Sequence, residues 1–165
     1  MQTLQQKLDA FREDFETNKA PKEALEIMHR ATKELEDSGQ KERAIQLGDT
    51  FPEFSLPNQD GELVNLSDLL KKGPLVVSFF RGVWCPYCNI ELEAIGEIVD
   101  DVRAAGGDVV VISPSVQKMA QRAIKERNLS CDVLTDAGNE FANTLGTRFR
   151  LPDYLETLYR SFGVD

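Results

Sequence analysis

The sequence has little cysteine and little positive charge. Its three cysteines among 165 residues are too few, and odd in number, for a disulfide-stabilised secreted scaffold. Lys and Arg number 19 against 28 Asp and Glu, and the net charge of −9 disfavours nucleic-acid and anionic-membrane partners. No apolar run approaches the roughly 20 residues that span a bilayer, and the polar start is unlike a secretory signal. We therefore expect a cytoplasmic protein that binds neither nucleic acid nor membranes.

The first part of the chain has a helical pattern. Leu4, Leu8 and Phe11 recur at spacings of four and three, which places them on one face of a helix. A second apolar stripe follows and ends before a Ser-Gly pair. We predict a helical arm over residues 1–47, packed on the domain or on a second subunit, and one domain over residues 48–165.

Strands and helices alternate in the second part of the chain. Asp-Gly between short apolar stretches predicts a β-hairpin within residues 48–72. The segments after it are predicted as strand, helix, strand, helix and strand, in the order 75–80, 86–105, 109–113, 115–128 and 131–135. The first of these strands is an apolar run typical of a strand buried on both faces. This alternation predicts an α/β fold with a parallel sheet.

The segment RGVWCPYC, residues 81–88, joins the first of these strands to the helix that follows. Its Cys-x-x-Cys spacing also occurs in zinc sites. Zinc needs about four ligands, yet the only histidine is His29 in the arm, and no second cysteine pair exists. We therefore expect neither a metal nor a cofactor.

A cysteine pair at a strand–helix junction favours redox chemistry. Cys85 falls at the helix N-cap, Pro86 at the first helical position, and Cys88 one turn inside. Unpaired backbone N–H groups and the helix dipole there favour the thiolate, which lowers a cysteine pKa from about 8.5. We predict that Cys85 is the catalytic nucleophile and that Cys88 resolves the species it forms.

Four neighbours are candidate supporting residues. Arg81 either adds positive charge beside the thiolate or is a solvated loop residue. Trp84 and Pro86 flank the pair at a junction where packing alone does not explain them, and Tyr87 is interpreted as an apolar lid. Cys131 opens a predicted buried strand and is interpreted as a structural residue.

Three segments resemble the peroxiredoxin-like branch of the alkyl hydroperoxide reductase/thiol-specific antioxidant (AhpC/TSA) family: VSFFRGVWCPYC, GGDVVVISPS and CDVLTDAGNEFANTLG. The resemblance covers about residues 47–146. It implies a thioredoxin-like fold and thiol peroxidase or antioxidant activity. The family's peroxidatic sites carry proline and a hydroxyl residue where this chain has Ser78 and Gly82. The Cys-Pro-Tyr-Cys itself is similar to glutaredoxins, and Trp-Cys-Pro to thioredoxins.

The end of the chain departs from that fold. Thioredoxin-like folds finish with an antiparallel hairpin and a helix, whereas the segment after Gly146 contains a helix-like run and no strand pair. We expect the C-terminal hairpin to be missing and the domain to be truncated. The strand over 75–80 is then an open apolar edge, and with the amphipathic arm it predicts a homo-oligomer, such as a dimer.

These observations predict a thiol-dependent oxidoreductase that cycles Cys85 and Cys88 between dithiol and disulfide. The resemblance favours a peroxide as oxidant, with a thioredoxin- or glutathione-type electron donor. The site itself favours a protein disulfide, so disulfide reduction is the first alternative. A non-catalytic redox-sensing or interaction module that binds a partner through its arm is the second.

Overall fold

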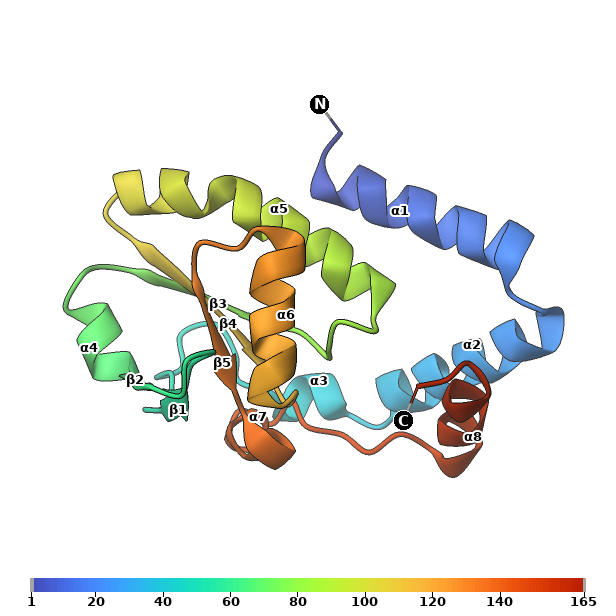
Figure 1. Cartoon of the computed structure of the whole chain (residues 1–165). Helices are drawn as coiled ribbons and strands as arrows, with labels where there is room; N and C mark the ends of the chain where they lie inside the picture. The colour runs from blue at the N-terminus through green and yellow to red at the C-terminus, as the bar shows by residue number, and fades with distance from the viewer. Residues whose placement is uncertain (1, 165) are drawn as a thin grey trace. The chain divides into compact units, whose positions relative to one another are not determined.

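The structure, a computed structural model, describes residues 2–164, whose helices and strands are labelled in Figure 1. The chain forms two compact units. The larger is Pro52–Phe141, and the smaller holds the chain up to Phe51 and from Ala142 onward. The division into an arm over residues 1–47 and a domain over 48–165 stays a prediction.

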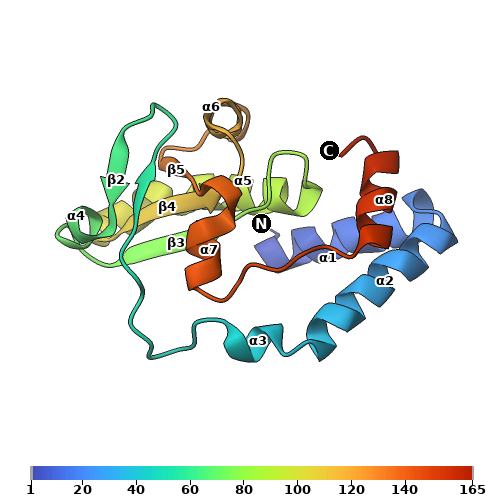
Figure 2. The ribbon, with the colours of Figure 1, turned by 90° about the horizontal axis from the view of Figure 1, so that it is seen from below.

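The larger unit contains a three-stranded parallel sheet. Its strands are β3 (Leu75–Phe79), β4 (Asp108–Ser113) and β5 (Asp132–Thr135), and β4 lies between the other two (Figure 2). Val77 lies opposite Val110 across the first pair, and Val111 lies opposite Val133 across the second. The predicted α/β fold with a parallel sheet is confirmed, and the three strands fall within one residue of their predicted bounds.

Two helices cover one face of this sheet. They are α5 (Pro86–Ala104) and α6 (Gln117–Arg127), which contact each other as well as β4 and β5. Every second residue of the strands points toward them, so Val109, Val111 and Val133 pack in one buried cluster with apolar side chains of both helices. Ile98, which the helical periodicity predicts to face inward, is instead 47% exposed.

Aromatic side chains pack together in the same unit. The ring centroid of Phe141 lies 5.3 Å from that of Phe54 and 6.3 Å from that of Phe79. Phe79 lies opposite Ile112 in the register, on the face of the sheet that α5 and α6 do not cover. The short helices after β5 are η2 (Ala137–Asn139) and α7 (Glu140–Thr144).

The predicted hairpin is formed by β1 (Ser55–Pro57) and β2 (Leu63–Asn65), which pair antiparallel before the short helix α4 (Leu66–Leu70). Gln59 lies between the two strands. Its side-chain oxygen accepts a hydrogen bond from the backbone N–H of Val133 over 3.1 Å.

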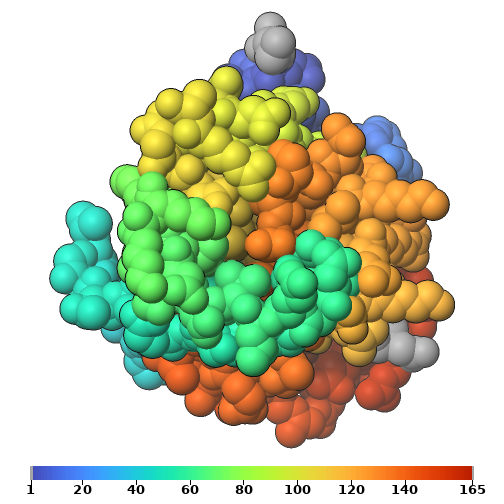
Figure 3. Space-filling view, turned by 60° about the vertical axis from the view of Figure 1, so that its left-hand side comes forward, coloured from blue at the N-terminus to red at the C-terminus, as the bar shows by residue number. Residues whose placement is uncertain are grey.

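The backbone oxygen of Gln59 accepts bonds from the side-chain amides of Gln117 and Gln121, each over 3.0 Å. Figure 3 shows the tip of the hairpin, in green, beside the orange surface of α6. These bonds fix the hairpin against α6 and the outer edge of β5.

The smaller unit is helical, as the sequence predicts. Its helices are α1 (Leu4–Asp14), the π-helical turn η1 (Phe15–Lys19), α2 (Lys22–Asp37), α3 (Gln40–Arg43) and α8 (Asp153–Ser161). α8 packs on α2, where the Arg30 guanidinium lies 4.4 Å from the ring centroid of Tyr154. The Tyr154 hydroxyl donates to Glu34 over 2.5 Å.

Strand β3 forms one edge of the sheet. Within residues 2–164 it pairs with β4 alone, and no strand follows β5. Val76 and Phe79 are 46% and 37% exposed. The interpretation of this strand as buried on both faces is therefore wrong: an apolar run in an edge strand has the same sequence signature as one in a central strand. No helix in the described part of the chain is long and apolar enough to cross a membrane.

Candidate active site

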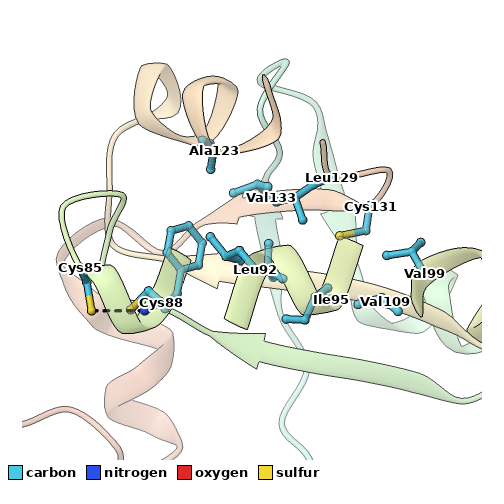
Figure 4. Packing of buried hydrophobic residues seen from close by; sticks show 13 residues of the cluster. Cys85, Cys88, Leu92, Ile95, Val99, Val109, Ala123, Leu129, Cys131 and Val133 are labelled. Atoms are coloured by element: carbon cyan, nitrogen blue, oxygen red, sulfur yellow. Dashed lines mark hydrogen bonds between the residues drawn. The ribbon is translucent and has the colours of Figure 1, made fainter. Parts of the chain in front are cut away.

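Cys85 caps the N-terminus of α5. Pro86 stands at the first helical position, and the backbone N–H of Cys88 donates to Cys85 Sγ over 3.5 Å (Figure 4). The local fold follows from the sequence, because proline has no N–H to leave unsatisfied at that position and its fixed φ suits the first turn. The predicted N-cap placement of the cysteine pair is confirmed.

Arg81 contacts both sulfur atoms. Its Nη2 donates to Cys85 Sγ over 3.5 Å, and its backbone N–H donates to Cys88 Sγ over 3.5 Å. The sequence leaves open whether Arg81 adds positive charge beside the thiolate or is a solvated loop residue. In the structure its guanidinium lies beside Cys85.

The two thiols have opposite electrostatic environments. A hydrogen bond from the Cys88 side chain, aided by the Arg81 side chain and the Cys88 backbone N–H, lowers the pKa of Cys85 to about 5 although burial raises it. The pKa of Cys88 is raised, because its side chain is hydrogen-bonded to Cys85 and is buried. These environments favour the thiolate at Cys85 and the protonated thiol at Cys88.

The loop before α5 is held by its own backbone. The N–H of Cys85 donates to the carbonyl of Gly82 over 3.0 Å. The side-chain amide of Asn89 donates to the carbonyl of Val83 over 2.9 Å. Sequence reasoning missed Asn89, whose only signal is an amide side chain in the first turn of the helix that follows the loop.

Gly82 lies in close contact with Trp84. A Cβ atom on Gly82, whose φ is +156°, would lie 2.6 Å from Trp84 Nε1 and 3.2 Å from Ser115 Oγ. No side chain fits there without moving the indole. This is the position that carries a hydroxyl residue in the resembling family, and here the hydroxyl of Ser115, from the loop after β4, lies beside it.

Both cysteines of the pair are buried, whereas two aromatic side chains next to them in the sequence are exposed. Cys85 is 1% exposed and Cys88 is 8% exposed, whereas Trp84 and Tyr87 are among the exposed large apolar side chains. The lid role of Tyr87 stays a prediction.

Cys131 is separate from this pair. Figure 4 shows Cys85 and Cys88 at one end of the buried cluster and Cys131 at the other, beside Leu129. Burial raises the pKa of Cys131 to about 11. All three thiols are free, and no group of three or more His, Cys, Asp or Glu side chains that could hold a metal ion occurs within residues 2–164.

Residues 46–162 match the Redoxin family. Among curated proteins, peroxiredoxin Bcp of Escherichia coli K12 is 31% identical over 102 residues, which cover 62% of this chain and 65% of that protein. The thiol-disulfide oxidoreductase ResA of Bacillus thuringiensis is 26% identical over 107 residues, covering 64% of this chain and 61% of that protein. The chain thus spans less than two thirds of the length of either relative.

A solved structure agrees with the sequence comparison. Peroxidoxin BcpB of Mycobacterium tuberculosis superposes with a TM-score of 0.60 at 28% identity, over 63% of this chain and 68% of that one. The resemblance stated from the sequence is confirmed, and the fold is thioredoxin-like.

Proposed function

Because this chain belongs to the Redoxin family, we propose that it reduces peroxides with Cys85 as the peroxidatic cysteine and Cys88 as the resolving cysteine. The observation that carries the proposal is the contrast between the two thiols. Cys85 has a pKa lowered to about 5, whereas that of Cys88, one helical turn away, is raised. A thiolate is the nucleophile that attacks a peroxide, and a neighbouring thiol completes the cycle.

In the first step the Cys85 thiolate attacks the terminal oxygen of a peroxide ROOH. The S–O bond forms, the O–O bond breaks, and the alkoxide leaves as ROH after taking a proton. Cys85 is oxidised to a sulfenic acid and the peroxide is reduced. The Arg81 guanidinium, 3.5 Å from the sulfur, stabilises the negative charge that develops on the oxygens.

In the second step Cys88 attacks the sulfenic sulfur. The S–S bond forms, the S–O bond breaks, and hydroxide leaves as water with the proton of the Cys88 thiol. One thioredoxin-type dithiol, or two molecules of a glutathione-type monothiol, then returns two electrons and two protons by thiol–disulfide exchange. The raised pKa of Cys88 makes it a poor leaving group. Attack of the donor on Cys88 Sγ, which releases the Cys85 thiolate, is therefore favoured over attack on Cys85 Sγ, which would release Cys88.

Protein disulfide reduction is the second candidate function. A Cys-x-x-Cys with a low-pKa thiol at the helix N-cap is also the site of thiol–disulfide exchange, and one matching relative is named a thiol-disulfide oxidoreductase. Against it stands the burial of Cys85, which is 1% exposed. A disulfide in a folded protein reaches such a sulfur only after the residues that bury it move.

One pair of assays separates the two functions. The reduced protein is given hydrogen peroxide or an organic hydroperoxide with a thioredoxin regenerating system, and in parallel the insulin disulfides. We expect peroxide turnover that is lost in Cys85→Ser. In Cys88→Ser we expect one equivalent of peroxide to be consumed, and a sulfenic acid trapped by dimedone, with no turnover.

The matched control is Cys131→Ser, which keeps the pair and should keep turnover. Insulin reduction without peroxide consumption would replace the proposal with the second candidate. Reversible oxidation of the pair with no turnover of either substrate would favour a redox-sensing module. A reduced pair needs a reducing compartment, so we also place the protein in the cytoplasm, and the exposed edge at Val76 and Phe79 supports a homo-oligomer.

A further inference from the structure

We propose that Trp84 is a positioning residue that holds the Arg81 guanidinium against Cys85, and that Gly82 is the residue whose missing side chain makes room for it. The inference rests on the proposed function in so far as Cys85 is the reacting thiol. It concerns the state of the thiol, which is measurable without any substrate.

The first observation is a stack. The guanidinium carbon of Arg81 lies 4.7 Å from the centre of the Trp84 ring, while its Nη2 donates to Cys85 Sγ. Both Arg81 and Trp84 are exposed. A long side chain at the surface samples many rotamers, and a contact with an aromatic face reduces that freedom. The indole therefore fixes the direction in which the charge points.

The second observation is the support beneath the indole. A Cβ atom at Gly82 would lie 2.6 Å from Trp84 Nε1 and 2.8 Å from Trp84 Cδ1. These distances are too short for any side chain at residue 82. Glycine at this position thus lets the indole lie on the backbone, and the indole in turn sets the position of Arg81.

The third observation is that few charges act on this sulfur. The ionisable groups that act on Cys85 are the Cys88 thiol and the Arg81 guanidinium. The hydroxyl of Ser115, 3.2 Å from a Cβ position on Gly82, carries no charge. Among the described residues Arg81 is the only cation that acts on Cys85, so a shift of its guanidinium changes the charge environment of the sulfur.

The chain offers a direct probe, since Trp84 is its only tryptophan. Intrinsic tryptophan fluorescence therefore reports on this one stack. In the reduced protein we expect the fluorescence to titrate with the same midpoint as thiolate formation at Cys85, followed by ultraviolet absorbance. The change should be absent from Cys85→Ser and from the protein oxidised to the Cys85–Cys88 disulfide.

Substitutions test the order of dependence. Trp84→Leu should lower the rate of Cys85 alkylation at a fixed acidic pH by about two- to fivefold, the equivalent of an exposed cation–π contact, and Trp84→Phe should lower it less. Gly82→Ala should act like Trp84→Leu, although it leaves both side chains present. Arg81→Gln should have the largest effect, and adding Trp84→Leu to it should change nothing further, because the indole acts through the guanidinium.

The proposal is overturned if Trp84→Leu leaves the alkylation profile of a folded protein unchanged while Arg81→Gln shifts it. It is equally overturned if Trp84→Leu and Arg81→Gln have additive effects. Circular dichroism and thermal melting identify a variant that fails to fold, and in that event Trp84→Phe and Gly82→Ala decide the question. A protein that shows these shifts but turns over no peroxide would refute the proposed function and leave this inference intact.

Discussion

The backbone N–H of Cys88 donates to Cys85 Sγ over 3.5 Å, so the residue that we propose to resolve the oxidised sulfur also favours its thiolate. The backbone N–H of Arg81 in turn donates to Cys88 Sγ. The three residues form one short hydrogen-bond network, in which the pKa of Cys85 is lowered and that of Cys88 is raised.

Replacing Cys88 should change the acidity of Cys85. The side-chain hydrogen bond from Cys88 is the largest influence that lowers the pKa of Cys85. Cys88→Ala removes this donor, whereas Cys88→Ser keeps a hydroxyl in its place. We expect the alkylation midpoint of Cys85 to rise in Cys88→Ala and to rise less in Cys88→Ser, as measured by iodoacetamide rates against pH. A midpoint in Cys88→Ala equal to that of the unmodified protein would show that the backbone donors and Arg81 suffice.

The stability of the reduced protein should depend on pH in a defined direction. The pKa of Cys85 is about 5 in the folded chain and about 8.5 in an unfolded one. Between these values the unfolded state binds the proton and the native state does not, so stability rises with pH by at most about 1.4 kcal/mol per pH unit. It is lost as pH falls through about 5.

Cys88 has the opposite dependence, because its pKa is raised on folding. Above about 8.5 the unfolded state loses this proton more readily, and stability should fall again. Thermal melting of the reduced protein across this range should therefore show a maximum in the mildly alkaline region. The rise toward it should be missing in Cys85→Ser. An identical pH profile for both proteins would mean that Cys85 is not a native thiolate.

Gly73 is expected to tolerate no side chain. Its φ is +144°, and a Cβ there would lie 1.9 Å from the backbone oxygen of Gly106, which cannot move aside as a side chain would. Gly106 itself has a φ of +86° with nothing within 4 Å of its Cβ position. We expect Gly73→Ala to destabilise the protein by more than about 2 kcal/mol and Gly106→Ala by about 1 kcal/mol, measured by denaturant unfolding. Equal losses would indicate that backbone strain alone matters.

Self-association should depend on the edge of the sheet. Val76 is the second residue of β3 and is half exposed. A lysine in an edge strand opposes pairing with another chain. We expect Val76→Lys to shift the sedimentation of the protein toward the monomer. Val116→Lys, a change at another exposed valine that lies outside the sheet, is the control and should leave it unaltered. A monomeric unmodified protein at tens of micromolar would contradict the prediction.

Much of the larger unit follows from local sequence. The helix over α5 was expected to begin at Pro86, and it does, because proline and the capping Cys85 fix the first turn. The N-cap placement of the redox pair followed from the same two residues. The apolar run of β4 identifies a central strand in which Val110 is buried, and Val133 of β5 is buried as well.

Other features depend on contacts that no local pattern encodes. The run of β3 has the composition of a buried strand, yet Val76 is exposed because no second neighbour strand lies beside it. The stack of Arg81 on Trp84 requires the close approach of an indole to Gly82, which glycine permits but which the spacing of these residues does not predict. The π-helical turn that begins at Phe15 likewise has no sequence signal that periodicity detects.

The two edges of the sheet differ in a way that limits how copies of the chain can join. At β5 the outward N–H of Val133 already donates to the side chain of Gln59. This N–H is therefore not available to pair with a strand of another chain. At β3 no strand pairs with the outer side within residues 2–164. We therefore expect copies that join strand to strand to bring β3 to β3 about a twofold axis, which uses the open edge of both. In that arrangement the hairpin contact that positions Gln59 would oppose growth beyond two chains.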